Sequence, residues 1–290
     1  MTSRISLNIH GHNVVDKPRL LNFLQQLQPA AVLVLDNYSL AREIKGLLPA
    51  CSVIFREYER DKKLHIDFTP EQWLNAHAHQ AEGGIILHVM NEQSFDKDVL
   101  KWLCDLMRLA APRRIPLIVG NWAVGNPLPE QWPMAKEFLQ LLDQHRDLFI
   151  MGLHEYAGGV VTSGLYGGYP DNAGVTPGQP GGMNLIPPEN WPKDVSTVTR
   201  YHMGRFKFMV DYCQSIGLKP PRIILTEHGF DDTSDIKAWE DTLQRTSPYL
   251  NIRGWKTLVA TWSNWFGRLD WSTQRAYFEQ LAWADRLLQG

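Results

Sequence analysis

The sequence predicts an α/β protein in which eight parallel strands close into one (β/α)8 barrel, the TIM-barrel architecture. Short apolar runs alternate with amphipathic, helix-like runs from one end of the chain to the other. The apolar runs show no polar alternation, which is typical of parallel strands that are buried on both faces. Eight alternations are more than a doubly wound sheet usually contains, and 290 residues are enough for a single barrel over residues 1–290.

The expected elements follow this alternation in chain order. Thr69 can cap the helix that begins at Pro70, because proline suits a first helical turn and Glu71 adds an acid there. Strands are expected at residues 6–10, 31–36, 52–56, 84–90, 116–120, 149–154, 222–226 and 257–262. Helices are expected at residues 19–27, 70–77, 98–109, 130–144, 198–216 and 236–245, with a closing helix at 273–288.

One connection is much longer than the others. Residues 157–196, after the sixth strand, are dense in glycine, proline, tyrosine and asparagine. Structureless loops of this length in compact domains usually have a function, and a loop that follows a strand lies on the functional face of a barrel. We expect a lid or a wall of the site there, with an inert insertion as the alternative.

Composition argues against several kinds of partner. The net charge of −2 gives no electrostatic basis for binding nucleic acid or an anionic membrane, and no apolar run is long enough to span a bilayer. Cys51, Cys104 and Cys213 are widely spaced, which favours reduced, buried thiols over disulfides or a zinc cluster. The first residues lack a signal-peptide pattern, so the chain as given is expected to be cytoplasmic; a removed signal or release at cell lysis stays open.

Each expected strand ends in polar or aromatic residues, although the strand itself is apolar. The carboxyl ends of parallel strands meet at one edge, so these residues are expected to share the mouth of the barrel. In chain order the strand ends carry His10 and His12; Asp36 and Asn37; Arg56, Glu57 and Tyr58; Asn91 and Glu92; Asn121 and Trp122; His154, Glu155 and Tyr156; Glu227 and His228; and Trp262, Ser263 and Asn264.

Two glutamates in this set have particular chemical meaning. Glu92 follows the fourth strand and Glu227 follows the seventh. Two carboxylates that reach one edge from separate strands are the groups needed to cleave a glycosidic bond. The chain also has 11 tryptophans, several at strand ends, and such rings stack on sugar faces, although most tryptophans fill cores.

Four short motifs resemble those of retaining glycoside hydrolases in the large (β/α)8 clan that includes the cellulase-like and β-mannanase-like families. They are Asn91-Glu92 after the fourth strand, His154-Glu155-Tyr156 after the sixth, Thr226-Glu227 after the seventh and Trp262 after the eighth. Their order and strand placement together carry the resemblance. The sequence departs from the pattern at Gln93, where a proline is usual. It also has no clear second histidine near the third or fourth strand, because His88 lies inside a strand.

The resemblance implies different roles for the two glutamates. Glu92 is identified with the general acid/base, and Glu227 with the nucleophile of a retaining double displacement. Tyr156 would donate a hydrogen bond that keeps Glu227 ionised, and Arg56 would add positive charge. The simpler alternative for Arg56 is an ion pair with Glu57.

The resemblance also implies contacts to the sugar. Asn91 would bind the 2-hydroxyl, and His154 would line the cleavage subsite. Trp262 would form a platform under the sugar, with core packing as its alternative. Trp122 or Trp265 would extend the cleft.

Two other functions remain open at the level of sequence. His10-Gly11-His12 resembles the metal-binding pair on the first strand of amidohydrolase barrels, but of the further ligands only His154 fits; His10 could equally bind sugar. A non-catalytic barrel that binds carbohydrate or a protein is the second alternative.

The sequence therefore predicts a glycoside hydrolase that acts on a β-linked glycan or glycoside. Two carboxyl groups suffice for this chemistry, so no metal or organic cofactor is expected. The expected partner is the carbohydrate substrate, and we expect the protein to be a monomer or a simple homo-oligomer.

Overall fold

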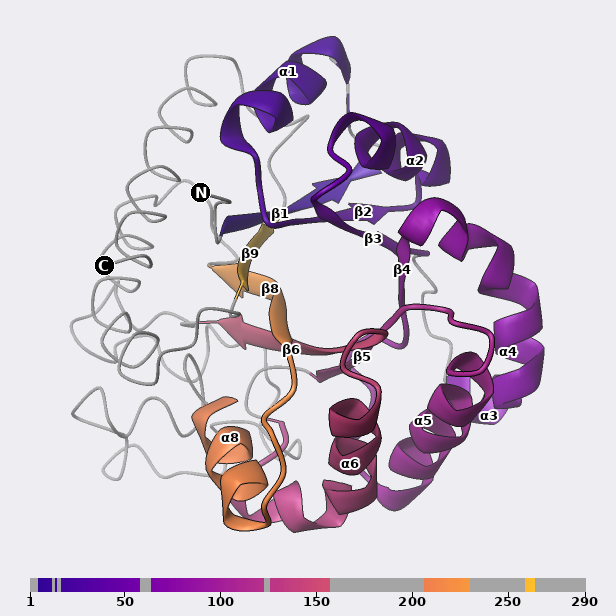
Figure 1. The fold of residues 1–290 in the computed structure, drawn as a ribbon, viewed down its shortest axis with the longest axis vertical. Coiled ribbons are helices and arrows are strands. Elements are labelled where there is room, and N and C mark those ends of the chain that lie inside the picture. The colour runs from indigo at the N-terminus through magenta and orange to yellow at the C-terminus, as the bar shows by residue number, and fades with distance from the viewer. Residues whose placement is uncertain are drawn as a thin grey trace, which may run out of the picture.

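A computed structural model describes residues 5–11, 14, 17–57, 64–122, 126–156, 206–229 and 259–263. Eight parallel strands form a closed barrel in the order β1-β2-β3-β4-β5-β6-β8-β9. The sheet closes where β9 pairs with β1, with Ala260 opposite Ile5. Figure 1 looks into this ring of strands, and the described helices lie outside it at the top, right and bottom of the view. The strands are β1 (Ile5–His10), β2 (Ala31–Leu35), β3 (Ser52–Arg56), β4 (Ile86–His88), β5 (Leu117–Trp122), β6 (Phe149–Tyr156), β8 (Ile223–Gly229) and β9 (Val259–Ser263).

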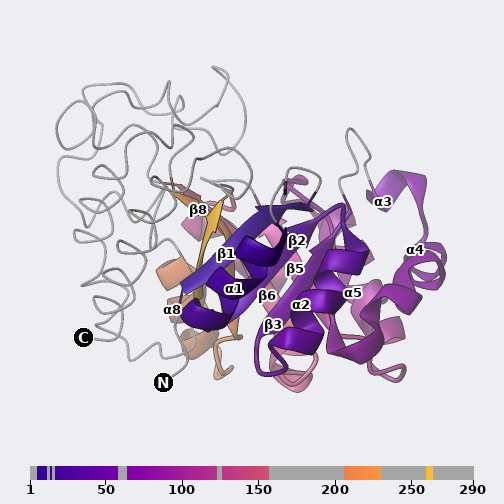
Figure 2. The same ribbon diagram turned by 90° about the horizontal axis from the view of Figure 1, so that it is seen from above.

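The predicted barrel is thus confirmed, and the helices lie on the outside of the strands, as the view in Figure 2 also shows. The α-helices are α1 (Lys17–Leu27), α2 (Tyr38–Leu47), α3 (Leu64–Asp67), α4 (Pro70–His77), α5 (Lys97–Ala110), α6 (Lys136–Gln144) and α8 (Phe206–Ser215). Two 3-10 helices, η2 (Ala78–Gly84) and η3 (Pro129–Ala135), precede β4 and α6.

Helix starts are where local sequence and structure agree best. Thr69 caps α4 as expected, because its side chain accepts from the Gln72 backbone N–H while the Gln72 side chain accepts from the Thr69 N–H. The helix α2, which begins after Asn37, is not among the helices expected from the sequence. The Asn37 side chain accepts from the Leu40 N–H at 3.0 Å, so a residue expected at the mouth is a helix cap.

Two expected elements have different bounds because of backbone constraints. The helix expected at residues 130–144 is split into η3 and α6, since Pro133 lies inside it and has no N–H to donate. The fourth strand is shorter than the expected range of residues 84–90, because Gly84 and Met90 have φ angles of 81° and 60°, which are incompatible with an extended chain.

A cluster of apolar side chains, here called the plug, fills the part of the barrel interior that lies away from the carboxyl ends of the strands. Five of its members are isoleucines, and branched side chains of this kind pack tightly in the layers of a barrel core. The plug therefore closes the barrel below the mouth and leaves a packed core instead of a pore. Its members are Ala31, Leu33, Ile54, Ile86, Ile118, Ile150 and Ile224.

A second, larger apolar core separates the strands from the helices, and it also takes up the thiols. Cys51, Cys104 and Cys213 are free and buried, as expected. Burial raises the pKa of each thiol to about 12, so all three stay protonated at neutral pH. Within the described ranges, no helix combines the length and the apolar character needed to cross a bilayer.

Several expectations fall outside the described residues. They concern the loop at 157–196, the helices at 236–245 and 273–288, and the first part of the helix at 198–216.

Candidate active site

The interior of the barrel changes from apolar to polar toward the carboxyl ends of the strands. Arg56, His88 and Thr226 each follow the plug residue of their own strand by two positions. Because side chains in a strand alternate with a period of two, these three lie on the same inner face as the plug. Among the side chains that the structure describes, six strands each place one buried polar group inside the barrel: Asn8, Arg56, His88, Asn121, His154 and Thr226.

Glu92 stands at the mouth, above this polar layer. Its side chain is 47% exposed, and its Oε1 lies 3.1 Å from Nδ1 of the fully buried His154. Its backbone N–H donates to the Asn121 carbonyl at 2.9 Å. The φ of Glu92 is 52°, a left-handed conformation that is uncommon for a residue with a side chain. A buried imidazole and a backbone bond therefore hold a carboxylate that remains open to the mouth.

Asn91 lies beside Glu92 and is half buried. Its Oδ1 is buried, with no hydrogen-bond partner among the residues that the structure describes. The Asn91 carbonyl accepts from Nε2 of Gln93 at 3.2 Å, so the residue that replaces the usual proline helps to hold this turn. A buried amide oxygen at the mouth is suited to accept from a hydroxyl group.

Two further nitrogen-bearing side chains, Arg56 and His88, belong to the same buried layer as His154. Burial holds the pKa of His88 well below its usual range, and electrostatic interactions with Arg56 and then with His154 lower it further. His88 is therefore neutral at physiological pH. Glu57, the expected alternative partner of Arg56, accepts from Nε2 of Gln80 and lies 3.7 Å from Nδ1 of His77.

Glu227 lies within β8, where the register pairs it with His154 of β6. The histidine that contacts the Glu92 carboxylate is thus also the backbone neighbour of Glu227. His10 pairs with Leu35, and Tyr156 pairs with Gly229 at the end of β6. The side chains of His10, Tyr156, Glu227 and Trp262 are not among those the structure describes, so their roles stay predictions.

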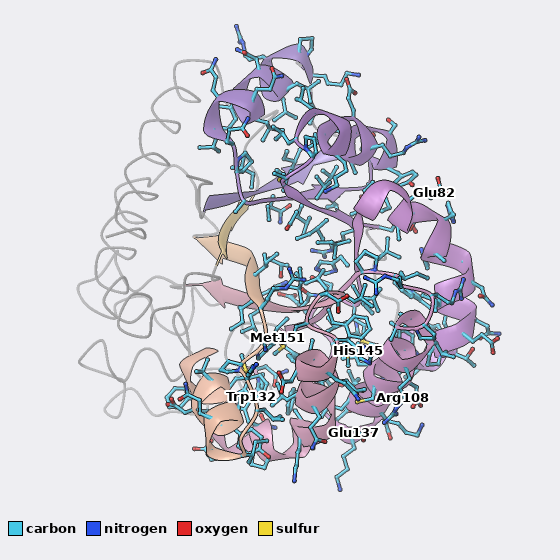
Figure 3. All side chains as sticks on the ribbon, in the orientation of Figure 1. Glu82, Arg108, Trp132, Glu137, His145 and Met151 are labelled. Carbon is cyan, nitrogen blue, oxygen red and sulfur yellow. The ribbon has the colours of Figure 1, made fainter. Side chains whose placement is uncertain are left out.

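The expectation that Trp122 extends the cleft is wrong. The register passes from Gly120 opposite Gly152 to Trp122 opposite Leu153, so Asn121 is an extra residue in β5. This shift turns Asn121 into the barrel and Trp122 out of it. Trp122 is fully buried, with ring centroids 4.8 Å from Phe95, 5.5 Å from Phe138 and 6.2 Å from Trp132. Trp132, labelled in Figure 3, belongs to η3 in the helical layer.

The sequence motifs assign no catalytic or binding role to Asn121, and they do not include Gly152. The sole local signal was a glycine inside a strand, which often marks the close approach of another group. A Cβ on Gly152 would lie 1.8 Å from Oδ1 of Asn121, so the glycine makes room for this amide.

The metal alternative gains no ligand cluster from the part of the chain that is described. There, no three His, Cys, Asp or Glu side chains lie close enough together to hold a metal ion. His12, the second member of the expected pair, lies outside the described residues.

No family model and no curated protein matches the sequence. Solved structures do match the fold. Endoglucanase Cel5A from Thermotoga maritima is 13% identical over 97% of this chain and 96% of its own, with a TM-score of 0.59. A xyloglucan-specific endo-β-1,4-glucanase of glycoside hydrolase family 5, from a metagenomic library and in complex with cellotriose, is 9% identical over 99% and 97%, with a TM-score of 0.58.

A family 30 xylanase, Xyn30A from Clostridium acetobutylicum, is 11% identical over 100% of this chain and 72% of its own, with a TM-score of 0.52. All three are (β/α)8 glycoside hydrolases. At these identities the likeness establishes a shared fold.

The burial of Trp122 predicts a role in stability. Trp122→Ala should lower the free energy of unfolding by about 3–5 kcal/mol, because it leaves a cavity between Phe95 and Phe138. Trp122→Phe should lose less, since a ring remains. Urea denaturation measures both changes. If Trp122→Ala kept the stability of the wild type but bound carbohydrate more weakly, Trp122 would instead line the cleft.

The low pKa of His88 predicts a specific pH dependence of stability. Below the ordinary histidine pKa of about 6.5, the unfolded chain binds a proton that the folded chain does not. The contribution is therefore fully present above about pH 6.5, and it falls by up to about 1.4 kcal/mol per pH unit below it. His88→Gln should flatten the profile of unfolding free energy between pH 7 and pH 5. Identical profiles for both proteins would contradict this assignment.

Proposed function

We propose that this chain is a glycoside hydrolase that cleaves β-linked glycans or glycosides with Glu92 and Glu227. One observation carries the proposal: His154 contacts the Glu92 carboxylate and pairs in register with Glu227. One residue at the mouth of the barrel thus contacts the side chain of Glu92 and is the backbone neighbour of Glu227. The fold shared with endoglucanases and a xylanase supports this function.

Glu92 has the surroundings that a general acid/base needs. Its half-exposed carboxyl group can reach a glycosidic oxygen at the mouth, while His154 fixes its orientation from below. In the first step Glu92 gives its proton to the leaving-group oxygen as Glu227 attacks the anomeric carbon. This breaks the glycosidic bond and forms a glycosyl ester on Glu227.

The second step reverses these roles. Glu92, now a carboxylate, takes a proton from water, and the water oxygen attacks the anomeric carbon of the ester. Glu227 leaves as a carboxylate, and the sugar is released with its original configuration. Because the ester removes the Glu227 charge, Glu92 can stay ionised after the first step and act as the base in the second.

The remaining residues bind and orient the sugar in this proposal. The buried Oδ1 of Asn91 accepts a hydrogen bond from the 2-hydroxyl, an interaction that strengthens in the transition state. Arg56 and Tyr156 hold Glu227 ionised, and Trp262 lies under the ring. His10 binds sugar at the rim. The substrates of the structural neighbours make β-1,4-linked glucans and xylans the first to screen.

The role of Glu227 can be tested by chemical rescue. Glu227→Ala should lower kcat on the order of 10⁴-fold or more, because the ester cannot form. Azide, which fits the space left by the carboxylate, should restore turnover and give a glycosyl azide of inverted configuration, identified by NMR. Glu57→Gln is the matched control, since Glu57 is also a rim carboxylate (side chain 42% exposed) but contacts Gln80 and His77. Full activity in Glu227→Ala would refute the assignment.

The role of Glu92 predicts a different rescue product. Glu92→Ala should lower turnover of ordinary glycosides by about 10²–10⁴-fold. A dinitrophenyl glycoside should still release its leaving group in a rapid burst, because that group departs without a proton. Azide should then attack the accumulated ester and give a product of retained configuration. An inverted azide from this variant would exchange the roles of the two glutamates.

A further inference from the structure

We propose that Asn121 is a positioning residue that sets the distance between the two carboxylates. Its side chain links the end of β4 to β8, and this link passes over β6. This inference rests on the proposed function and concerns how the same site is held in shape. We call the hydrogen-bonded set of Asn121, Thr226 and Val89 the cross-strand brace.

The brace reaches both glutamate-bearing segments through one side chain. Nδ2 of Asn121 donates to the Val89 carbonyl at 3.1 Å, and Val89 comes three residues before Glu92 in the chain. Oδ1 of Asn121 accepts from the Thr226 hydroxyl at 2.9 Å, and Thr226 is the residue directly before Glu227. The Asn121 carbonyl also accepts from the backbone N–H of Glu92 at 2.9 Å. Asn121 is therefore bonded to residues on both sides of the site.

The hydrogen bond between Asn121 and Thr226 passes over β6, a strand whose side chains would normally block it. The strand order places β6 between β5 and β8, so Asn121 and Thr226 are not on neighbouring strands. Their side chains meet over Gly152 of β6, where an added Cβ would lie 1.8 Å from the Asn121 Oδ1. Gly152 thus gives the brace its path through the barrel.

The brace also joins two irregularities of the sheet. On one side of β6 the register shifts at Asn121, and on the other side it shifts at Thr226, between Leu225 opposite Leu153 and Glu227 opposite His154. Extra residues of this kind re-aim the side chains that follow them. A hydrogen bond between the two extra residues makes the two shifts depend on each other.

Such a link is needed because the local backbone is strained. Asn121 and Glu92 have φ angles of 44° and 52°, and left-handed residues of this kind persist only where surrounding contacts hold them. Asn121 and Thr226 are fully buried, so water cannot replace the bond between them. Loss of the bond frees the segment that carries Glu227 to move relative to Glu92.

The distance between the carboxyl groups decides the chemistry of such a site. About 5–5.5 Å suits direct attack and retention, whereas about 6.5–9.5 Å leaves room for a water and gives inversion. A displacement of about 1 Å can cost on the order of a hundredfold in rate. The brace should therefore act on kcat and leave KM nearly unchanged.

The test compares Thr226→Val with Thr226→Ser on the best glycoside found for the wild type. Valine keeps the shape of threonine without its hydroxyl, and serine keeps the hydroxyl. Thr226→Val should lose about tenfold to a hundredfold in kcat with KM within about twofold, and Thr226→Ser should recover most of that loss. Adding Thr226→Val to Asn121→Ala should change kcat no further, because the bond is already absent.

A matched control separates positioning from general instability. Trp102→Phe removes a different hydrogen bond, which is partly buried and runs from Nε1 to the Phe68 carbonyl at 2.7 Å in the outer helical layer. It should lower Tm as Thr226→Val does and leave kcat unchanged. Gly152→Ala, which displaces the Asn121 amide, should reproduce the kcat loss by a second route if a threonine variant does not fold.

The outcomes distinguish the brace from the function on which it rests. If Thr226→Val keeps wild-type kcat while Glu92→Ala and Glu227→Ala are inactive, the brace is refuted and the hydrolase stands. Equal losses of kcat in Thr226→Val and Trp102→Phe also refute the brace, because they would follow stability alone. If the two alanine variants keep full activity, the proposed function itself fails.

Discussion

Closure of the sheet by β1 and β9 is the constraint on which the rest of the structure depends. A closed parallel sheet has no edge, so every strand has a hydrogen-bonded neighbour on both sides. Closure also creates an interior too narrow for anything but side chains. Branched residues such as Ile54 and Ile118 fill its lower part, and polar groups are confined to the end where the strands open toward the mouth.

That confinement explains the character of the site. Arg56, His88 and His154 bring three basic side chains into a small buried volume, and burial with mutual repulsion keeps His88 neutral. The Glu92 carboxyl group at the rim contacts His154. The barrel thus holds Glu92 above a buried layer of nitrogen-bearing side chains. In the proposed reaction this arrangement suits a carboxylate that must stay ionised beside one that must exchange protons.

The local sequence predicted much of the fold because its signals act over a few residues. Apolar runs marked all eight strands within a few positions, and Thr69 marked the start of α4. The errors have local causes too. Asn37 looked like a residue of the mouth but caps α2, Pro133 interrupts a helical pattern, and positive φ angles at Gly84 and Met90 shorten β4.

The sequence by itself indicated the eight strands of the barrel, and it placed Glu92 just after the fourth strand and Glu227 near the end of the seventh. Periodicity and strand order are properties of the chain alone, so they can be read without coordinates. Only the tertiary structure decided which way Asn121 and Trp122 face. An extra residue in a strand is defined by the hydrogen bonds of its neighbour, so the shift opposite Gly152 cannot be read from alternation. That shift sent the tryptophan into the core and brought the asparagine to Thr226.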